Sequence, residues 1–363
     1  MMSVILFIII LLALVVVHEF GHFIAAKWSN MRVDEFAFGF PPRIFSKKVG
    51  ETTYAFNAIP LGGYVSILGE NGEPDDKAKG NPRAFSNRPW YAQLFVLSAG
   101  VIMNVLFAWA IFIFTSYGNV EVSVDGSSYA DRIKDKKVYV AYVGENSPSK
   151  MAGLETGDII MKVSSGGATI IPTDSTSTIN FIGSHINDSI KIIYKKPDGQ
   201  IKDTIITGVY GIIPGKKALG IALDTIGTVD AGIKDAFILG TYKLENIFVA
   251  MIDGFKQLFI SAKNGDSVVD SLSGPIGIAK MVGDTSEFGY KALLTFTAVL
   301  SINLAIFNAL PLPALDGGRF IIVILETVSR RKFPVKMMTI LNGVFFALLL
   351  LLLIVVSVKD VVR

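Results

Sequence analysis

The sequence of 363 residues contains no cysteine and only three histidines. The absence of cysteine excludes both a disulfide framework and any thiolate metal site, so a bound transition metal would need histidine and carboxylate ligands. Charged residues make up only 18% of the chain, and the net charge of +3 argues against a nucleic-acid partner. Because 51% of the residues are hydrophobic, the chain is too apolar for an ordinary soluble domain.

Four apolar runs are long enough to cross the roughly 30 Å hydrocarbon core of a bilayer. They are Val4 to Ala26, Leu94 to Phe114, Leu293 to Leu310 and Met338 to Val358. The first run lacks the charged flank and the small-residue cleavage site of a secretory signal, so we expect it to be retained. The sequence therefore predicts a multi-pass α-helical membrane protein.

Lysine and arginine residues predict the orientation of these spans, because such residues accumulate on the cytosolic side. The loop from Trp28 to Tyr91 contains eight of them, and the loop from Asp316 to Met337 contains five. We therefore expect both loops in the cytosol. The large section between the second and third spans is expected outside.

The first apolar run contains His18-Glu19-Phe20-Gly21-His22. Residues four apart lie on one face of a helix, so the two imidazoles are expected to point to one place. Many zinc hydrolases take two ligands from this H-E-x-x-H spacing and use its glutamate on a water molecule. Ionisable groups inside an apolar span are costly and usually functional, which favours a metal site over two structurally buried histidines.

A catalytic zinc ion needs a third protein ligand and an open position for water. Since the chain has no cysteine and His185 lies in the section expected outside, this ligand must be a carboxylate. Asp316 and Glu326 are the candidates within later apolar sequence. Asp316 follows Pro311 and Pro313, which interrupt the third span, and broken backbone at membrane depth persists only inside protein or beside a wet cavity. We favour Asp316 and expect Glu326 to snorkel to the surface.

Three further stretches have a distinct character. Lys137 to about Thr207 has the pattern of a soluble domain, and Thr156-Gly157-Asp158-Ile159-Ile160 within it resembles the bacterial PDZ module, which binds peptides by adding a strand to a sheet edge. Tyr54 to Leu68 predicts an unusually apolar hairpin or bent strand. Ala236 to Ile260 predicts an amphipathic helix, lying on the membrane surface or on the PDZ domain, rather than a fifth span.

Together these motifs resemble the site-2 protease family of intramembrane zinc metalloproteases, in particular its bacterial regulator-of-sigma-E type, with a single PDZ domain. The resemblance rests on H-E-F-G-H, on the PDZ module, and on four further motifs: P-L-G-G-Y-V at 60–65, S-A-G-V-I-M-N at 98–104, S-G-P-I-G-I-A at 273–279 and N-A-L-P-L-P-A-L-D-G-G at 308–318.

The resemblance implies one Zn²⁺ per chain, bound by His18, His22 and Asp316, with Glu19 as the catalytic base. It also implies residues that contact the substrate or steady the site, and a β-loop that clamps an unwound substrate by strand pairing. These residues are Asn104, Asn303, Asn308, Pro311, Pro313, Gly62, Gly63, Tyr64 and Val65. Arg319, which follows the glycine pair, is interpreted as peripheral.

The predicted fold class is an α-helical polytopic membrane protein with about four transmembrane helices, a membrane-associated β-hairpin loop and an inserted α/β PDZ domain. The predicted domains are the first transmembrane helix (1–27), a cytoplasmic loop with a membrane-inserted β-loop (28–91), the second transmembrane helix (92–118), an extracytoplasmic PDZ domain (119–225), an amphipathic or interfacial linker (226–290), the third transmembrane segment (291–318), and a basic loop with the fourth transmembrane helix (319–363).

The predicted function is zinc-dependent intramembrane endopeptidase activity in a bacterial cytoplasmic (inner) membrane. The resemblance implies single-span membrane substrates, such as anti-sigma factors and remnant signal peptides, which are cut after a prior site-1 cleavage. The expected partners are these substrates, which contact the PDZ domain directly or through an exposed C-terminus, and membrane lipid, but no nucleic acid.

Three alternatives stand against this prediction, one a different enzyme and two without enzymatic activity. A membrane-anchored zinc protease that cleaves in the cytosol would take a glutamate ligand from a soluble downstream loop. A zinc transporter would repeat its ligands on several spans, whereas histidine occurs in only one span here, and a PDZ scaffold would tolerate the loss of Glu19.

Overall fold

The computed structural model describes residues 2–70, 78–124, 132–213, 215–265, 273–331 and 333–362. The predicted cytoplasmic loop, PDZ domain and linker each include residues outside this description, namely 71–77, 125–131 with 214, and 266–272. The chain forms two compact units. One consists of Met1–Thr115 with Phe237–Arg363, and the other of Ser116–Ala236.

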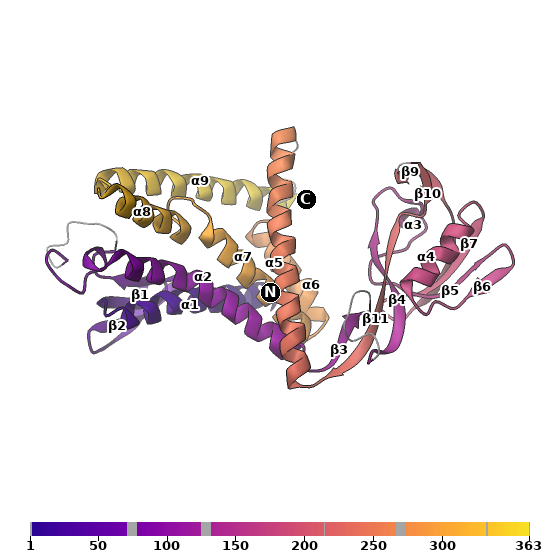
Figure 1. Cartoon of the computed structure of the whole chain (residues 1–363), viewed down its shortest axis with the longest axis horizontal. Helices are drawn as coiled ribbons and strands as arrows, with labels where there is room; N and C mark the ends of the chain where they lie inside the picture. Colours follow the sequence, from indigo (N-terminus) through magenta and orange to yellow (C-terminus); the bar gives the residue numbers. More distant parts are fainter. Residues whose placement is uncertain are drawn as a thin grey trace. The chain divides into compact units, whose positions relative to one another are not determined.

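Helices dominate the first unit (Figure 1). They are α1 (Met2–Trp28), the short η1 (Phe85–Asn87), α2 (Trp90–Thr115), α5 (Ile233–Asn264), α6 (Pro275–Glu287), α7 (Tyr290–Ala309), α8 (Asp316–Ser329) and α9 (Val335–Val362). In the described part of the chain, four helices are long and apolar enough to cross a membrane, within α1, α2, α7 and α9. This agrees with the prediction of a multi-pass membrane protein.

Small residues allow α1 and α2 to approach each other closely. A Cβ atom on Gly21 of α1 would lie 2.4 Å from the carbonyl oxygen of Ala99 in α2, so only glycine fits there. Further along α2, Ala108 and Phe112 are buried in one cluster with Ile302 of α7. In lipid there is no hydrophobic driving force between helices, so close van der Waals packing of this kind is a main source of helix association.

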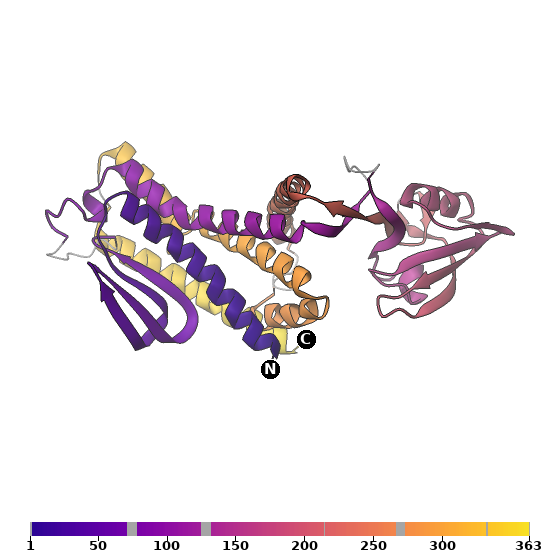
Figure 2. The same cartoon turned by 90° about the horizontal axis from the view of Figure 1, so that it is seen from below.

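A β-sheet lies along α1 (Figure 2). Its strands β1 (Val33–Val49) and β2 (Thr52–Ile67) pair antiparallel, with several shifts of register. Phe36 has two partners, Tyr54 and Val65, because both strands bend and pair more than once. In the described pairing, the end of β2 contacts β1 along one side only and forms an edge of the sheet.

The turn between β1 and β2 is tied to the helices by one carboxylate. Glu51 accepts hydrogen bonds at 2.7 Å from Lys27, at the end of α1, and from both terminal nitrogens of Arg83. The apolar hairpin expected from Tyr54 to Leu68 is therefore the second half of a larger structure that begins at Val33.

The remaining helices of this unit differ in how they are packed. The apolar side chains of α5, including Leu244, Met251 and Phe255, pack against α2 and α7. The helix is amphipathic, as expected, but its described apolar face lies on other helices. By contrast, α9 is exposed along most of its length, and Asp360 near its end accepts hydrogen bonds from the backbone N–H groups of Gly274 and Gly277 at the start of α6.

The second unit is a mixed α/β structure. Its described elements are β3 (Gly118–Ser123), β4 (Lys134–Val143), α3 (Pro148–Met151), β5 (Ile159–Ser165), β6 (Ala168–Ile170), α4 (Ser175–Ser184), β7 (Ser189–Lys195), β8 (Ile201–Thr207), β9 (Val209–Ile213), β10 (Lys216–Ala218) and β11 (Ile221–Ala231). The main sheet has the strand order β3-β11-β4-β5-β7-β8, with β6 on β5, and β9 pairs with β10.

Alternating apolar residues explain the core of this second unit. In β4, Val138 and Val140 point to one face of the sheet, and in β7 Ile190 and Ile192 do the same, because side chains two apart in a strand share a face. All four are almost completely buried, together with Leu154.

Candidate metal centre

Three side chains that are far apart in the sequence meet in the first unit. His18 and His22 lie one turn apart on α1, and Asp316 is the first residue of α8. Asp316 Oδ2 lies 3.0 Å from His18 Nε2 and 3.1 Å from His22 Nε2, and the two nitrogens are 3.2 Å apart. Both histidines are buried and the aspartate is half-buried.

These distances fit a single metal ion. A tetrahedral zinc ion with metal–ligand bonds of about 2.0–2.2 Å places neighbouring ligand atoms roughly 3.3–3.6 Å apart. The three observed separations, 3.0 to 3.2 Å, are a few tenths of an ångström shorter. Two imidazole nitrogens and one carboxylate oxygen also form the set of a catalytic zinc site, in which water takes the fourth position.

The backbone of α2 sets the protonation of one histidine. His22 Nδ1 lies 2.8 Å from the carbonyl oxygen of Val96. A carbonyl can only accept, so Nδ1 carries a proton and donates it, which in a neutral imidazole leaves the lone pair on Nε2, the atom that faces Asp316. Such a second hydrogen bond is the usual support of a metal-bound histidine.

A glycine makes room for both imidazoles against α2. A Cβ atom on Gly100 would lie 2.4 Å from His22 Nε2 and 2.6 Å from His18 Cε1. Both distances are shorter than real Cβ contacts, so any larger residue would displace the rings. The space at Gly100 is therefore part of the site.

The two glycines after Asp316 position this residue, because they let the first turn of α8 pack closely against the end of α7 and the connection that follows it. The helix α7 ends at Ala309, and Pro311 and Pro313 lie in the connection to α8. A Cβ atom on Gly317 would lie 2.3 Å from the carbonyl oxygen of Ala309, and one on Gly318 would lie 2.1 Å from a backbone oxygen of the connection. Only glycine allows the start of α8 to pack on this interrupted segment.

A cavity of about 460 Å³ opens beside two of the three candidate ligands. Its lining includes His22 and Asp316, the candidate base Glu19, and Tyr64 and Val65 from the sheet edge. Water and a polypeptide segment could therefore reach the same space as the candidate ligands. A carboxylate in this position can accept a proton from such a water molecule.

Two lining residues were missed at the level of sequence. Arg319 donates at 2.6 Å to the carboxylate of Glu70 and also to its backbone oxygen, and its guanidinium lies 5.7 Å from the ring centre of Phe85. Arg319 and Glu70 both line the cavity, so the interpretation of Arg319 as peripheral is wrong. Its position three residues after Asp316, on the same face of α8, was the available signal.

The other expected substrate contacts are distributed unevenly. Asn104 lies 3.3 Å from His18 Nδ1, and a Cβ atom on Gly63 would lie 3.7 Å from Glu19 Cγ. A Cβ atom on Gly62 would instead meet the ring of Phe40. Asn303 and Asn308 are half-buried in α7, and the described cavity lining does not include them or the two prolines of the connection.

Comparison with known proteins extends over almost the whole chain. The family model "Peptidase family M50" matches residues 6–352. A relative from Clostridium perfringens is 32% identical over 355 residues, covering 96% of each chain. The zinc metalloprotease RasP of Oceanobacillus iheyensis is 26% identical over 453 residues, covering 100% of this chain and 99% of RasP. The chloroplastic membrane metalloprotease ARASP of Arabidopsis thaliana is 29% identical over 340 residues, covering 92% of this chain and 73% of ARASP.

The bacterial relatives carry zinc metalloprotease names, which agrees with the donor set of two histidines and one aspartate. The four helices that are long and apolar enough to span a membrane, among the residues described, agree with a membrane protease. The chain belongs to peptidase family M50, the site-2 protease family, and is an integral membrane zinc metallopeptidase.

Proposed function

We propose that this metallopeptidase cuts single-span membrane proteins within their transmembrane segments. The observation that carries the proposal is the meeting of His18, His22 and Asp316 on helices whose surroundings are apolar. His18 and His22 lie on one candidate span, α1, and Asp316 follows the point where another candidate span, α7, is interrupted. This placement suits chemistry at membrane depth. A protease that cleaves in the cytosol would gain nothing from this placement.

We assign the ligand roles to His18, His22 and Asp316, and the role of base to Glu19. Bound zinc supplies Lewis acidity, which polarises the scissile carbonyl and acidifies a water molecule. Glu19 lines the cavity beside His22 and Asp316, so its carboxylate takes the proton from this water and returns one to the leaving amine.

The edge of the β-sheet is proposed to hold the substrate. A transmembrane helix hides its carbonyl groups in internal hydrogen bonds, so it must unwind locally before attack. The end of β2 has one edge paired with β1, while Tyr64 and Val65 line the cavity. An unwound substrate that adds as a strand there would recover the hydrogen bonds it loses. The rest of the substrate segment is proposed to contact Asn303, Asn308, Pro311 and Pro313.

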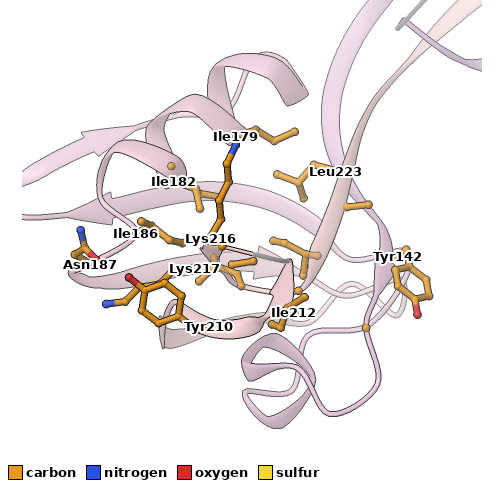
Figure 3. A pocket seen from close by; sticks show the side chains of 18 residues that line it. Tyr142, Ile179, Ile182, Ile186, Asn187, Tyr210, Ile212, Lys216, Lys217 and Leu223 are labelled. Carbon is orange, nitrogen blue, oxygen red and sulfur yellow. The ribbon is translucent and has the colours of Figure 1, made fainter.

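The second unit is proposed to be the PDZ domain and to contact the substrate outside the membrane. It has a cavity of about 610 Å³ between α4, β11 and the β9–β10 hairpin (Figure 3). Ile179, Ile182 and Leu223 make this cavity apolar, and Lys216 and Lys217 add positive charge at it.

A strand of substrate has an available edge beside this cavity. The first residues of β11, Ile221 to Leu223, pair with β4, whereas β3 pairs only with Ile226–Ala231 among the described residues. A peptide end could therefore pair with the start of β11 while its carboxylate meets the lysines. We infer that this cavity receives the C-terminus that a prior site-1 cut exposes. Anti-sigma factors and remnant signal peptides are the proposed substrate classes.

The proposed location is the bacterial cytoplasmic (inner) membrane, with the PDZ domain outside and the two loops rich in lysine and arginine in the cytosol. The segments 28–91 and 319–363 then carry the cytosolic loops, and 119–225 the external domain. The segment 226–290 connects that domain to the third span.

The decisive variant for the proposed chemistry is Glu19→Gln. In proteoliposomes with a single-span substrate, we expect this variant to abolish cleavage while zinc content stays at the wild-type level, because glutamine keeps the shape but cannot take a proton. Cleavage at the wild-type rate would refute the assignment of the base. Mass spectrometry of the products tests the location of the cut, since a cut outside the transmembrane segment would favour the cytosolic protease.

The proposed role of the second unit has its own test. Lys217→Glu should slow cleavage of a substrate with a free C-terminus outside the membrane and leave a C-terminally amidated substrate unaffected. Lys202→Glu, in the exposed strand β8, is the matched control. Equal rates for both substrates with both variants would contradict recognition of a peptide end.

A further inference from the structure

Asn104 of α2 is buried directly against the candidate metal site. Its side chain is completely inaccessible, and its amide nitrogen Nδ2 lies 3.3 Å from His18 Nδ1. The amide oxygen Oδ1 is also buried and has no hydrogen-bond partner among the described residues. An unpaired buried acceptor costs free energy, so its presence beside a histidine calls for a physical reason.

The chemistry of His18 supplies this reason. Its Nε2 faces Asp316 and His22 and is the atom placed to bind zinc. A neutral imidazole that binds metal through Nε2 carries its proton on Nδ1, which is then a donor. An amide nitrogen is a donor as well, so the two groups cannot bond in that arrangement.

A half-turn of the Asn104 amide resolves both problems. The two ends of an amide have the same shape, and the hydrogen-bond network decides which end points where. With the oxygen toward His18, Oδ1 accepts from Nδ1–H. The unpaired acceptor is then satisfied, and the amide nitrogen takes the buried position that the oxygen leaves.

We propose that Asn104 is a positioning residue that accepts the Nδ1–H of His18 and thereby holds this histidine ready to bind zinc. The proposal rests on the ligand roles proposed above and adds a support for one of them. It assigns Asn104 a function in the unliganded enzyme, whereas the family resemblance left it between substrate contact and support.

The spacing along α2 supports this assignment. Val96, Gly100 and Asn104 are four residues apart and form one stripe on the helix. Val96 accepts from His22, Gly100 leaves room for both rings, and Asn104 faces His18. The two histidines are thus supported in the same way, once by a backbone carbonyl and once by an amide.

Asn104 is itself held in place by α7. Its backbone oxygen accepts a hydrogen bond at 2.8 Å from the hydroxyl of Ser301, which is completely buried. This bond fixes the backbone of Asn104, and complete burial leaves its side chain little room to turn away from His18. Removing a hydrogen-bond partner of a metal-bound histidine typically lowers metal affinity by about 10- to 100-fold.

Two substitutions separate the acceptor role from a donor role. Asn104→Leu removes both the acceptor and the donor of the amide while keeping a side chain of similar size. Asn104→Asp keeps an acceptor, but its carboxylate cannot donate. We expect zinc affinity, measured by competition with a chelator, to fall about 10- to 100-fold in Asn104→Leu and to stay at or above the wild-type level in Asn104→Asp. Asn246→Leu, on the exposed face of α5, is the control that should leave zinc affinity unchanged.

Zinc affinity in Asn104→Leu within twofold of wild type would overturn the proposal, as would equal losses in both variants. A pure substrate contact predicts unchanged zinc affinity in both, with cleavage lost in Asn104→Asp. If His18 and Asp316 do not bind zinc at all, Asp316→Ala retains zinc, so failure of the ligand assignment is distinguishable from failure of this proposal.

A measurement on the unchanged protein makes the test independent of folding in the variants. The chain has only three histidines, so ¹⁵N-labelled histidine gives a simple NMR spectrum in detergent micelles. In the zinc-loaded protein we expect two slowly exchanging ring Nδ1 protons, from His18 and His22. A His18 Nδ1 that is unprotonated or exchanges rapidly would contradict the proposed hydrogen bond.

Discussion

The substitution Gly100→Ala tests how closely the two histidines are packed against α2. The added Cβ atom would lie 2.4 Å from His22 Nε2 and 2.6 Å from His18 Cε1, whereas ordinary contact begins at 3.4 Å. The rings must therefore retreat by about 1 Å, and active sites tolerate only about 0.5 Å. A displacement of this size costs about 100-fold in rate, or about 2.7 kcal/mol in activation free energy.

The assay is the rate of cleavage of a single-span substrate in proteoliposomes, together with zinc content and thermal stability. Alanine favours a helix over glycine by about 1 kcal/mol, so we do not expect the helix itself to fail. Gly343→Ala in α9 is the matched control, because a Cβ atom there would meet nothing within 4 Å. It should leave all three quantities unchanged. Wild-type cleavage and zinc content in Gly100→Ala would refute the arrangement of α1 on α2.

Three further changes probe the surroundings of the site. Gly318→Ala should release most of the zinc, because its Cβ atom would lie 2.1 Å from a backbone oxygen that cannot yield; metal analysis of the purified variant checks this. Arg319→Leu breaks the pair with Glu70 across the cavity and should lower kcat/KM by roughly 10-fold with zinc retained, and wild-type kinetics would contradict a role for this pair. Hydrogen bonds from Arg83 hold the pKa of Glu51 at about 2, below its ordinary 4.5, so this ion pair stabilises the fold above about pH 4.5 and its contribution is lost as the pH falls toward 2. Glu51→Gln should therefore flatten the acid side of the thermal unfolding profile in detergent, and an unchanged profile would contradict this contribution.

Local sequence patterns were sufficient to select the three side chains that meet in the structure. The spacing of His18 and His22 fixes their common face on any helix, and the lack of cysteine leaves a carboxylate as the third candidate. Asp316 stood out because two prolines precede it inside apolar sequence. The long apolar runs likewise predict the four candidate spans, since length and hydropathy are local properties.

Other features depend on contacts between distant segments and leave little trace in one sequence. The carbonyl of Val96 supports His22 through the backbone, which every residue possesses. The space at Gly100 becomes meaningful only once α1 is seen against α2. The multiple pairing of β1 with β2 and the packing of α5 on α2 and α7 also arise from tertiary contacts, which a periodicity analysis does not contain.

The most direct test is the zinc content of the purified wild-type protein compared with Asp316→Ala in detergent. If His18, His22 and Asp316 hold the ion, the wild type should contain about one zinc per chain and the variant almost none, with both proteins folded by circular dichroism. A variant that keeps its full zinc content would show that the ion is held elsewhere, and the proposed peptidase site would then be wrong.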